Sequence, residues 1–155
     1  TEVTRPIARK GLTINEGGDD STQRAIIDAH INNNRLKDVI MDRCIIDGLV
    51  YTNWLYKEGK VDHHTHDYAY RGYIELIKDL DIVFHTEPVS MVDDGERSTS
   101  FRFQTEIYNL FKRQLERLRY DRINFTGKIV NLEGSVDKRF NDIIMTLQTY
   151  ECNAR

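Results

Sequence analysis

The sequence predicts a three-layer α/β domain in which helices cover both faces of a parallel β-sheet. Short runs rich in β-branched and other apolar residues occur at 39–41, 82–84 and 129–132. Each run is followed by a longer segment whose apolar residues recur every three or four positions, which is the spacing of one helix face. Strands that alternate with helices pair in parallel through right-handed crossovers. A chain of 155 residues suits one such domain, and we assign residues 1–155 to it.

The composition is that of a soluble globular protein, with 39% hydrophobic and 30% charged residues. A net charge of −3 gives no general attraction to nucleic acids or membranes, and no apolar run reaches the ~20 residues of a membrane span. Two cysteines form no disulfide framework, so we expect a reducing, cytoplasmic location. Cys44, beside Arg43, has either a lowered pKa or, as we favour, the role of a small buried hydrophobe.

The N-terminal part is predicted to be a strand end and a helix. TEVTRP reads as the end of a strand because Pro6 favours an extended course before it, and residues 1–12 would be that end and the loop beyond it. A turn then precedes a helix in which Asp20 is the expected N-cap and Gln23 completes a capping box. This helix would end near Ile31.

The central stretch is KDVIMDRCIIDGLVYTNWLY, residues 37–56, which we interpret as a buried strand leading directly into a helix. The strand would be 39–41, and Asp42 and Arg43 would stand at its carboxyl end, where open α/β sheets bind ligands. The alternative is an ion pair that only holds the strand–helix turn. Gly59 would end the helix.

Three histidines, His63, His64 and His66, raise the hypothesis of a metal site, because imidazole is a common metal ligand. No cysteine or carboxylate completes the set at zinc-like spacing. We therefore favour a solvated loop ahead of a core helix that carries Tyr73 and Ile77 on its apolar face.

The second half of the chain repeats the strand–helix pattern. Strand 82–84 leads to a polar loop, 91–100, and to a long amphipathic helix with Arg102 in its first turn. A basic residue there interacts unfavourably with the helix dipole, so helix stability does not explain Arg102. Either it has a functional role, or it forms an ion pair with Glu106 or with an acidic residue of the loop.

The last unit is strand 129–132 and a helix that Ser135 caps. The apolar residues of this helix fall at i, i+4, i+7, i+8 and i+11, so we expect them to pack on the sheet. They are Val136, Phe140, Ile143, Ile144 and Leu147.

Several short motifs, taken in their order and spacing, resemble those of P-loop nucleoside and nucleotide kinases. DRCIIDGLVY (42–51) resembles the DR(S/Y) element of thymidylate and deoxynucleoside kinases, and DDGERSTSFRFQTEIYNLF (93–111) resembles the arginine-bearing lid, about residues 91–104. NLEGSVDKRF (131–140) resembles the last strand and the turn that contacts adenine, and TEVTRP the end of the second strand. The set is similar to nucleoside-kinase-like ATPases related to ribosylnicotinamide kinase domains.

The phosphate loop of these kinases, GxxxxGK[ST], does not occur in the sequence, since the pairs Gly59-Lys60 and Gly127-Lys128 precede Val and Ile. The resemblance implies the sheet order 2-3-1-4-5, of which the chain would hold the second to the fifth strand. Without the first strand, the middle of the sheet would hold unpaired backbone groups that cost about 1–3 kcal/mol each, against a typical stability of roughly 5–15 kcal/mol. We therefore expect the first strand, its loop and its helix upstream of Thr1.

The resemblance implies ATP-dependent phosphoryl transfer to a nucleoside or nucleoside monophosphate, with ATP and Mg²⁺ as cofactors. This chemistry needs alignment and positive charge more than covalent help. Arg97 and Arg102 would close over the transferred phosphoryl group. Asp42 would hold Mg²⁺ through water or orient the acceptor, and Glu2 would be the base for a 5′-hydroxyl.

The other site residues implied by the resemblance fall into two groups. Four would contact the acceptor: Arg5, Gln23, Arg43 and Asp47. Three would border the base of ATP: Gly134, Lys138 and Arg139.

Two further hypotheses stay open beside the kinase. One is an ATP-binding switch that keeps the fold but does not turn over small substrates, and the other is a catalytically inactive, kinase-like interaction module. For the kinase we expect a small-molecule nucleoside or nucleotide as the partner, no nucleic acid and no membrane, and we leave a homodimer open.

Overall fold

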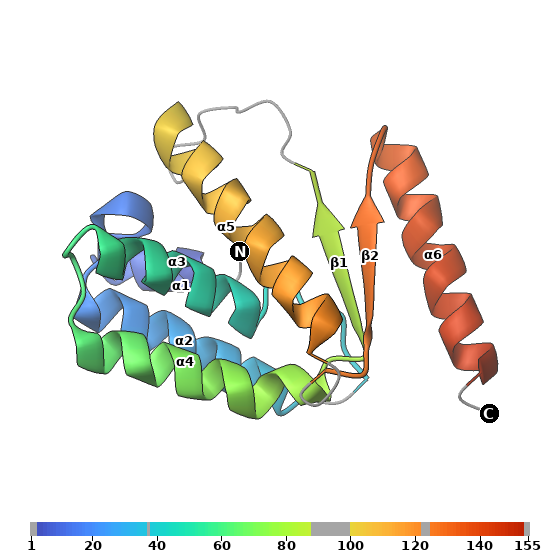
Figure 1. Ribbon diagram of the computed structural model, residues 1–155, viewed down its shortest axis with the longest axis horizontal. Coiled ribbons are helices and arrows are strands. Elements are labelled where there is room, and N and C mark those ends of the chain that lie inside the picture. The colour runs from blue at the N-terminus through green and yellow to red at the C-terminus, as the bar shows by residue number, and fades with distance from the viewer. Residues whose placement is uncertain (1–2, 37, 88–99, 122–124, 154–155) are drawn as a thin grey trace.

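The computed structural model describes residues 3–36, 38–87, 100–121 and 125–153. Helices dominate these ranges, and two short strands stand near the middle of the molecule (Figure 1). The elements are α1 (Thr4–Arg9), η1 (Asn15–Gly17), α2 (Asp20–Asn34), α3 (Ile45–Lys57), α4 (His63–Leu76), η2 (Ile77–Asp79), β1 (Ile82–Thr86), α5 (Phe101–Tyr120), β2 (Lys128–Leu132) and α6 (Val136–Asn153). No helix in this part of the chain is both long and apolar enough to cross a membrane.

Four helices, α2 to α5, form what we call the helical body, with α3 in contact with each of the other three. Its core is one continuous cluster to which all four helices contribute. The predicted apolar face of α3 is buried in this core, since Leu49 and Val50 are 2% and 1% exposed. Burying one such side chain contributes about 1.5–3 kcal/mol, so packing in the helical body is the main source of its stability.

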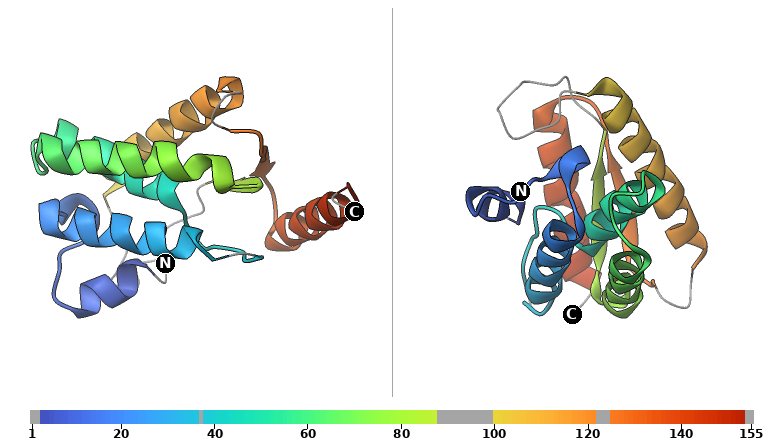
Figure 2. Two further views of the ribbon diagram at one scale, coloured as in Figure 1. Left: turned by 90° about the horizontal axis from the view of Figure 1, so that it is seen from below. Right: turned by 90° about the vertical axis from the view of Figure 1, so that its left-hand side faces the viewer.

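β1 and β2 form a two-stranded parallel sheet with α5 as the crossover, in register from Ile82–Lys128 to Thr86–Leu132. The predicted parallel pairing of these two segments is confirmed. No further strand is paired with them among the described residues, so the predicted order 2-3-1-4-5 stays a prediction. The sheet lies between the helical body and α6 (Figures 1 and 2).

One face of the sheet packs on the helical body. Val83 and Ile129 are partly buried against its core. His85 stacks on Tyr108 of α5, with ring centroids 6.1 Å apart and an interplanar angle of 13°. These contacts fix the orientation of the strands relative to α5, so the carboxyl end of β1 is held next to the helical body.

Residues 39–41 are not a strand, contrary to the prediction. Val39 and Ile40 are 46% and 75% exposed. A strand is held by the hydrogen-bond ladder to its neighbour, and none of the described residues forms such a ladder with this segment. The β-branched run therefore lies along the rim of a groove instead of inside a sheet.

Residues 4–9 form helix α1 and not the predicted strand end. Pro6 lies in the first turn, where the backbone N–H has no intrahelical acceptor in any helix, so the missing donor costs little. Val3 and Ile7 pack against Ile26 of α2 in a small cluster separate from the main core. This apolar packing favours a helix, so Pro6 marks a first helical turn and not the extended segment that we predicted.

The ends of α2 also differ from the prediction. Asp19, and not Asp20, is the N-cap, because its carboxylate accepts the backbone N–H of Thr22 at 2.9 Å. That hydrogen bond also lowers the pKa of Asp19. The helix continues past Ile31 to Asn34, whose side-chain amide donates to the carbonyl of Leu76 at 3.2 Å.

Residues 63–66 form the first turn of α4, so the solvated loop predicted there is wrong. Asp62 is the N-cap and accepts the backbone N–H of Thr65 at 2.7 Å. His66 stacks on Tyr56 of α3, with ring centroids 4.5 Å apart. Within the described ranges, no three His, Cys, Asp or Glu side chains are grouped as metal ligands.

The N-cap of α6 is Ser135 as predicted, since its hydroxyl accepts the backbone N–H of Lys138 at 3.2 Å. The predicted packing of the apolar stripe on a sheet is wrong for its first half, because Val136 and Phe140 are 80% and 60% exposed. The second half borders the groove described below, through Ile143 and Leu147.

Candidate functional site

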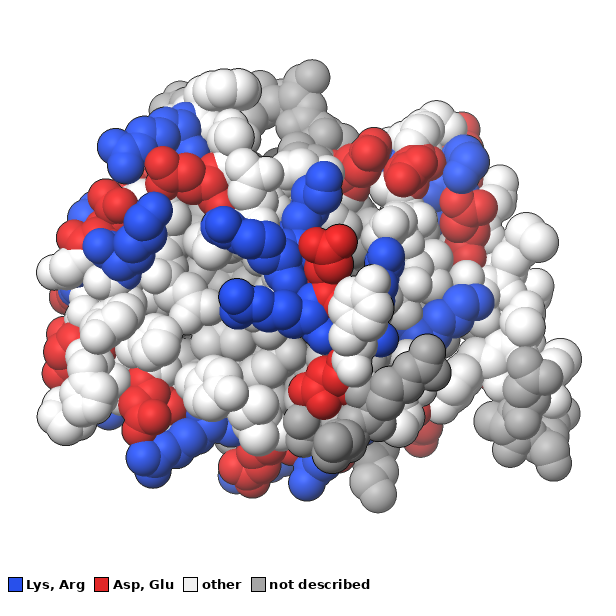
Figure 3. All heavy atoms as spheres, viewed as in Figure 1, with Lys and Arg blue, Asp and Glu red and all other residues white. Residues whose placement is uncertain are grey.

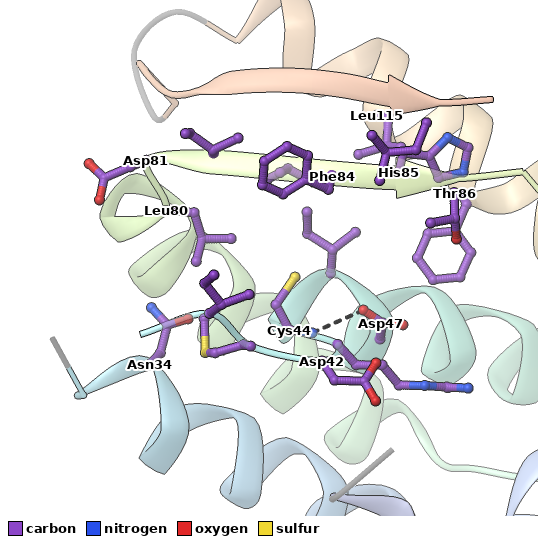
Figure 4. A pocket seen from close by; sticks show the side chains of 18 of the residues that line it. Asn34, Asp42, Cys44, Asp47, Leu80, Asp81, Phe84, His85, Thr86 and Leu115 are labelled. Atoms are coloured by element: carbon purple, nitrogen blue, oxygen red, sulfur yellow. Dashed lines mark hydrogen bonds between the residues drawn. The ribbon is translucent and has the colours of Figure 1, made fainter. Parts of the chain in front are cut away.

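A large open groove separates residues 38–44 from β1. Its volume of about 1570 Å³ exceeds the roughly 300–1,000 Å³ of an ordinary small-molecule pocket. Residues 38–44 and the start of α3 form one wall, α5 and α6 contribute the others, and β1 runs along the floor. The edge of β1 that does not pair with β2 has no strand beside it in the described chain. Figure 4 shows side chains from β1 and from the wall opposite projecting into the same space.

We call the part of the groove near the carboxyl end of β1 its polar end. Asp42, Arg43, Asp47 and Tyr51 line it. In Figure 4, Asp42 and Asp47 lie on the side of the groove toward His85 and Thr86, whereas Asn34 and Asp81 mark the opposite end. Ligands of open α/β sheets bind beyond the carboxyl ends of the strands. Asp42 and Arg43 lie at that edge of the sheet, although residues 39–41 do not form a strand.

Arg43 has a backbone conformation that is rare for its residue type, with φ at 73°. A non-glycine residue in this region costs on the order of 1 kcal/mol or more, and such strain gathers at functional sites. The turn directs the guanidinium over the ring of Tyr51, with 5.7 Å from its carbon to the ring centroid. Asp47 accepts the backbone N–H of Cys44 at 3.0 Å, which caps α3 and holds the turn (Figure 4).

Burial controls the ionisation of this cluster. Burial raises the pKa of Asp47, and the nearby charge of Arg43 opposes that rise only in part. Although burial disfavours its charge, the pKa of Arg43 is raised by Tyr51 and by the carboxylates of Asp47 and Asp42. Burial also raises the pKa of the Cys44 thiol to about 12. Cys44 is therefore a protonated, partly buried group packed against the core, as we favoured, and not a nucleophile.

A second, small cavity of about 20 Å³, which we call the chamber, adjoins the polar end of the groove, and apolar atoms make up most of its surface. Four residues border both spaces: Asn15, Arg43, Asp47 and Tyr51. The other residues around the chamber are Thr4, Gln23, Ile26 and His30. A cavity needs about 10–15 Å³ to hold one water molecule, so the chamber takes a single water-sized group.

Two buried residues of α2 that have polar side chains border this chamber. Gln23 is 1% exposed, and its side-chain oxygen lies 3.1 Å from the hydroxyl of Thr52, which also lies 2.7 Å from the carbonyl oxygen of Gly48. His30 is 2% exposed, and its Nδ1 atom has no hydrogen-bond partner among the described residues. Burial and the charge of Arg43 lower the pKa of His30 to about 4, so the imidazole is neutral at pH 7.

The residues expected to border the base of ATP lie at the start of α6. Arg139 donates to the carbonyl of Gly134 at 2.9 Å and to the carbonyl of Glu87 at 3.3 Å. Lys138 pairs with Asp142 at 2.8 Å. Arg139 thus ties the first turn of α6 to the carboxyl end of β1. Figure 1 shows the carboxyl ends of both strands and the first turns of α5 and α6 at the same end of the molecule.

Arg102 is held in an ion-pair network on the surface of the helical body. Its Nε atom donates to Glu106 at 2.9 Å, and Glu58 lies 3.7 Å from its guanidinium. Glu106 also accepts the indole N–H of Trp54 at 2.7 Å. The structure therefore shows the predicted alternative of an ion pair with Glu106, and Arg102 does not border the groove.

The structure describes only part of the remaining predicted site. Arg5 is on α1 and borders neither the groove nor the chamber. The described part of the predicted lid, residues 100–104, is the N-cap and first turn of α5. Glu2, Arg97 and residues 91–99 of the lid are outside the described residues.

The surface over α5 carries charges of both signs. Figure 3 shows Lys and Arg side chains interspersed with Asp and Glu on this face. The exposed basic residues of α5 toward its C-terminal half are Lys112, Arg113, Arg117 and Arg119. Basic groups in the last turn of a helix are favourable to the helix itself, which gives Arg117 and Arg119 a structural role.

Sequence reasoning did not assign His30 and Tyr51 to the site, although both carried a signal. His30 stands seven positions after Gln23, which places the two side chains on the same face of a helix. Tyr51 follows the Asp-Arg pair within the kinase-like motif, eight positions after Arg43. An extension of the helical periodicity to polar residues would have found both.

The residues present fit the edges of a site for ATP and Mg²⁺. Asp42 is exposed on the groove and offers the hard oxygen ligand that Mg²⁺ prefers. Gly134 and Arg139 lie beyond the carboxyl end of β2, but neither of them lines the groove. The amide cradle and the Ser/Thr hydroxyl of a phosphate loop do not occur in the printed sequence. The fit is therefore to the periphery of the nucleotide and not to its phosphates.

Comparison with known families gives one match. Residues 6–131 match a family model described as an AAA domain, which is more than half of the chain. Neither a curated protein nor a solved structure matches the chain. The match runs from within α1 through most of β2 and so includes the helical body and most of the groove, but not the wall that α6 contributes.

Proposed function

Because the chain belongs to the AAA domain family, and so to the P-loop ATPase-like proteins, we propose that it is part of an ATP-dependent kinase of a nucleoside or nucleoside monophosphate. One observation supports this acceptor class above the others. Gln23, Arg43 and Asp47, three of the four residues expected to contact the acceptor, surround a single chamber that adjoins the groove. They come from α2, α3 and the turn before α3, so the fold gathers them.

The acceptor would lie at the polar end of the groove. The guanidinium of Arg43 is planar and permanently charged, so it suits the phosphate of a monophosphate or the hydroxyl end of a nucleoside. Tyr51 under the guanidinium and Asp47 beside it hold its orientation. Gln23 is held beside Thr52, and its side-chain amide would bond to a polar group of the acceptor.

The nucleotide would bind beyond the carboxyl ends of β1 and β2. Asp42 would hold Mg²⁺ through water, and Gly134, Lys138 and Arg139 would border the base. Bound ATP supplies the phosphoryl group. The residues of this chain orient the acceptor, exclude water from the polar end of the groove and place positive charge near it, which is what phosphoryl transfer needs.

We further propose that the groove along β1 receives a parallel strand that carries the phosphate loop. The unpaired edge of β1 offers backbone donors and acceptors to such a strand. Phe84 on the floor and Ile143 and Leu147 on the α6 wall offer apolar surface to it and to the helix that follows it. Any sequence found to precede Thr1 tests this directly: GxxxxGK[ST] in it supports the proposal, and a preceding sequence without that motif contradicts it.

The decisive experiment is an ADP-release assay on the full-length protein with Mg²⁺-ATP and a panel of nucleosides and nucleoside monophosphates. We expect ADP release that depends on the acceptor. Arg43→Ala should raise the KM for the acceptor at least tenfold with little effect on the KM for ATP, because a charged hydrogen bond contributes about 1.5–3 kcal/mol. Arg113→Ala, an exposed arginine of α5, is the control and should leave both unchanged.

Arg102 tests the proposed lid. For the kinase, Arg102→Ala should lower kcat by roughly a hundredfold while ATP binding is kept, as expected when a donor to the transferred group is removed. Equal losses in turnover and in ATP binding would show that Arg102 does not act on the transferred group.

A second candidate function is an ATP-binding switch or a catalytically inactive interaction module. The observation that favours it is the engagement of Arg102 by Glu106 and Glu58 on the helical body. ATP-dependent thermal stabilisation without acceptor-dependent ADP release would support the switch. Neither effect in the full-length protein would support the inactive module.

A further inference from the structure

The groove beside β1 is apolar in its middle part. Val39 and Ile40 on one wall are 46% and 75% exposed, and Ile143 and Leu147 line the α6 wall. Within the described chain, no strand pairs with the edge of β1 that faces this space. Apolar side chains beside an unpaired strand edge favour an apolar strand as the occupant, because it removes the side chains from water and completes the hydrogen bonds of the edge.

The end of the groove at which β1 begins is acidic, and we call it the acidic end. The exposed acidic residues that line it are Asp38, Asp79, Asp81 and Glu151. The two aspartates of the chain segment before β1 adjoin the last turns of α6, because the hydroxyl of Tyr150 donates to the carboxylate of Asp81 at 2.6 Å. Negative charge from three separate segments therefore meets at this end.

These carboxylates are not neutralised within the described part of the chain. Asp38, Asp79 and Glu151 form no ion pair there, and Arg35, which also lines the groove, forms none with them. At the polar end, by contrast, Arg43 lies among carboxylates whose charges raise its pKa. Like charges that gather in one place repel one another, and a cation placed between them removes that repulsion.

The groove also has a direction. In Figure 4, Asn34 lies with Asp81 at one end of the groove. Asp42 lies toward His85 at the other end, so residues 38–44 run the same way as β1. β2, on the other edge of β1, is parallel to it as well. A strand that lies between β1 and residues 38–44 and keeps this common direction begins at the acidic end.

We propose that the strand that enters the groove carries lysine or arginine residues directly before its apolar run, where they pair with the carboxylates of the acidic end. This inference rests on the strand proposed for the groove, and not on phosphoryl transfer. The apolar run would match the five residues of β1. The charges would also select the direction of the strand, because a reversed strand places its basic residues beside Arg43.

The test measures the binding of labelled synthetic peptides to the 155-residue chain by fluorescence anisotropy, after circular dichroism has verified its helical fold. Three peptides with blocked ends share a run of five β-branched residues. The first has two lysines before the run, the second has the same two lysines after it, and the third has two glutamates before it. The first two have the same composition and net charge, so they differ only in where a parallel strand places its lysines.

At low salt, we expect the peptide with lysines before the run to bind at least about fivefold more tightly than the peptide with lysines after it. The glutamate peptide should bind least tightly. Salt of about 0.5 M should reduce the advantage to less than about twofold, because exposed charges are screened.

Variants of the chain identify the carboxylates that carry the advantage. Asp79→Asn combined with Glu151→Gln should reduce it to near unity. Glu75→Gln combined with Glu116→Gln is the matched control, because it removes two exposed acidic groups that do not line the groove. This control should keep the advantage of the wild-type chain.

The outcomes separate this inference from the other proposals. Equal binding of the two lysine peptides contradicts it and leaves the groove as a site for a strand, whereas no binding of any peptide to the folded chain contradicts the strand as well. A dimer of the chain that the peptides do not dissociate would mean that a second copy occupies the groove, and the inference would be wrong. Peptide binding needs no ADP release, so a failure of the kinase function is seen separately.

A second measurement applies if the 155-residue chain does not fold by itself. The same two pairs of substitutions are then made in the full-length protein, and its unfolding in urea is followed. Asp79→Asn with Glu151→Gln should lower the midpoint more than Glu75→Gln with Glu116→Gln does, because only the first pair removes partners of the basic residues. An equal or smaller shift would overturn the inference.

Discussion

The helical body and the half of the molecule formed by β1, β2 and α6 differ sharply in how completely they bury their apolar residues. In the helical body, Ile27, Ile45 and Leu55 are each 0% exposed. In the other half, Phe140 and Met145 of α6 are 60% and 66% exposed. Both halves have amphipathic helices, so the difference does not come from the sequence pattern of the helices themselves.

The difference comes from what the helices pack against. α3 contacts three other helices, whereas α6 has the groove on the side of Ile143 and Leu147. The apolar stripe of α6 and the open edge of β1 meet in that groove. The helical body therefore buries its apolar residues against one another, whereas the half formed by β1, β2 and α6 borders the open groove. This difference supports the strand that we propose in the groove.

The largest expected effect comes from deleting a core side chain in the helical body. Leu55→Ala should lower the free energy of unfolding by about 2–5 kcal/mol, because it removes buried methyl groups and leaves a cavity in a close-packed cluster. The matched change in the sheet half, Met145→Ala on α6, should alter it by less than about 0.5 kcal/mol. Urea denaturation followed by circular dichroism measures both, and similar losses would show that α6 is as well packed as α3.

Part of this difference in burial could be predicted from the sequence, and part of it could not. The helices of the body were predictable because spacings such as Ile46, Leu49 and Val50 report burial on one face. The exposed stripe of α6 was not, because a periodic pattern shows which face is apolar but not whether anything covers it. The prediction of a strand at 39–41 was wrong for a related reason, because a β-branched run forms a strand only where a neighbouring strand pairs with it.

The sequence predicted where the candidate site lies better than it predicted which residues form it. The Asp-Arg pair before α3 identified the polar end of the groove, since that sequence marks the start of a helix beside a sheet edge. His30 was missed because a buried polar residue within a helix face carries no motif of its own. Arg5 was misplaced because the prediction of a strand around Pro6 put it at a sheet edge that α1 does not form.

The second prediction uses the burial of His30 within the helical body. Its pKa is lowered from 6.5 to about 4 by burial and by Arg43. Between these values the unfolded chain binds a proton that the folded protein does not, so stability is full above pH 6.5 and falls as the pH decreases toward 4. The loss from this group should reach roughly 3 kcal/mol.

His30→Asn should remove that part of the pH dependence, whereas His64→Asn, on the exposed start of α4, should leave it in place. Urea denaturation at several values between pH 4 and pH 7.5 gives the two slopes. If the variant of His30 keeps the wild-type slope, the imidazole binds protons equally in the folded and unfolded chains, and the lowered pKa is excluded.

The smallest effect, and the sharpest comparison of the two halves, comes from removing one N-cap in each. Asp19 and Ser135 cap α2 and α6 by accepting backbone N–H groups at 2.9 and 3.2 Å. Asp19→Ala should lower the free energy of unfolding by about 1 kcal/mol, because α2 unfolds together with the core that it helps to form. Ser135→Ala should lower it by clearly less, since the first turn of α6 opens locally without disturbing the helical body, and hydrogen exchange there should become faster. If Ser135→Ala costs as much as Asp19→Ala, α6 unfolds only with the core, and the view of the sheet half as an arrangement around a vacant strand position would have to be abandoned.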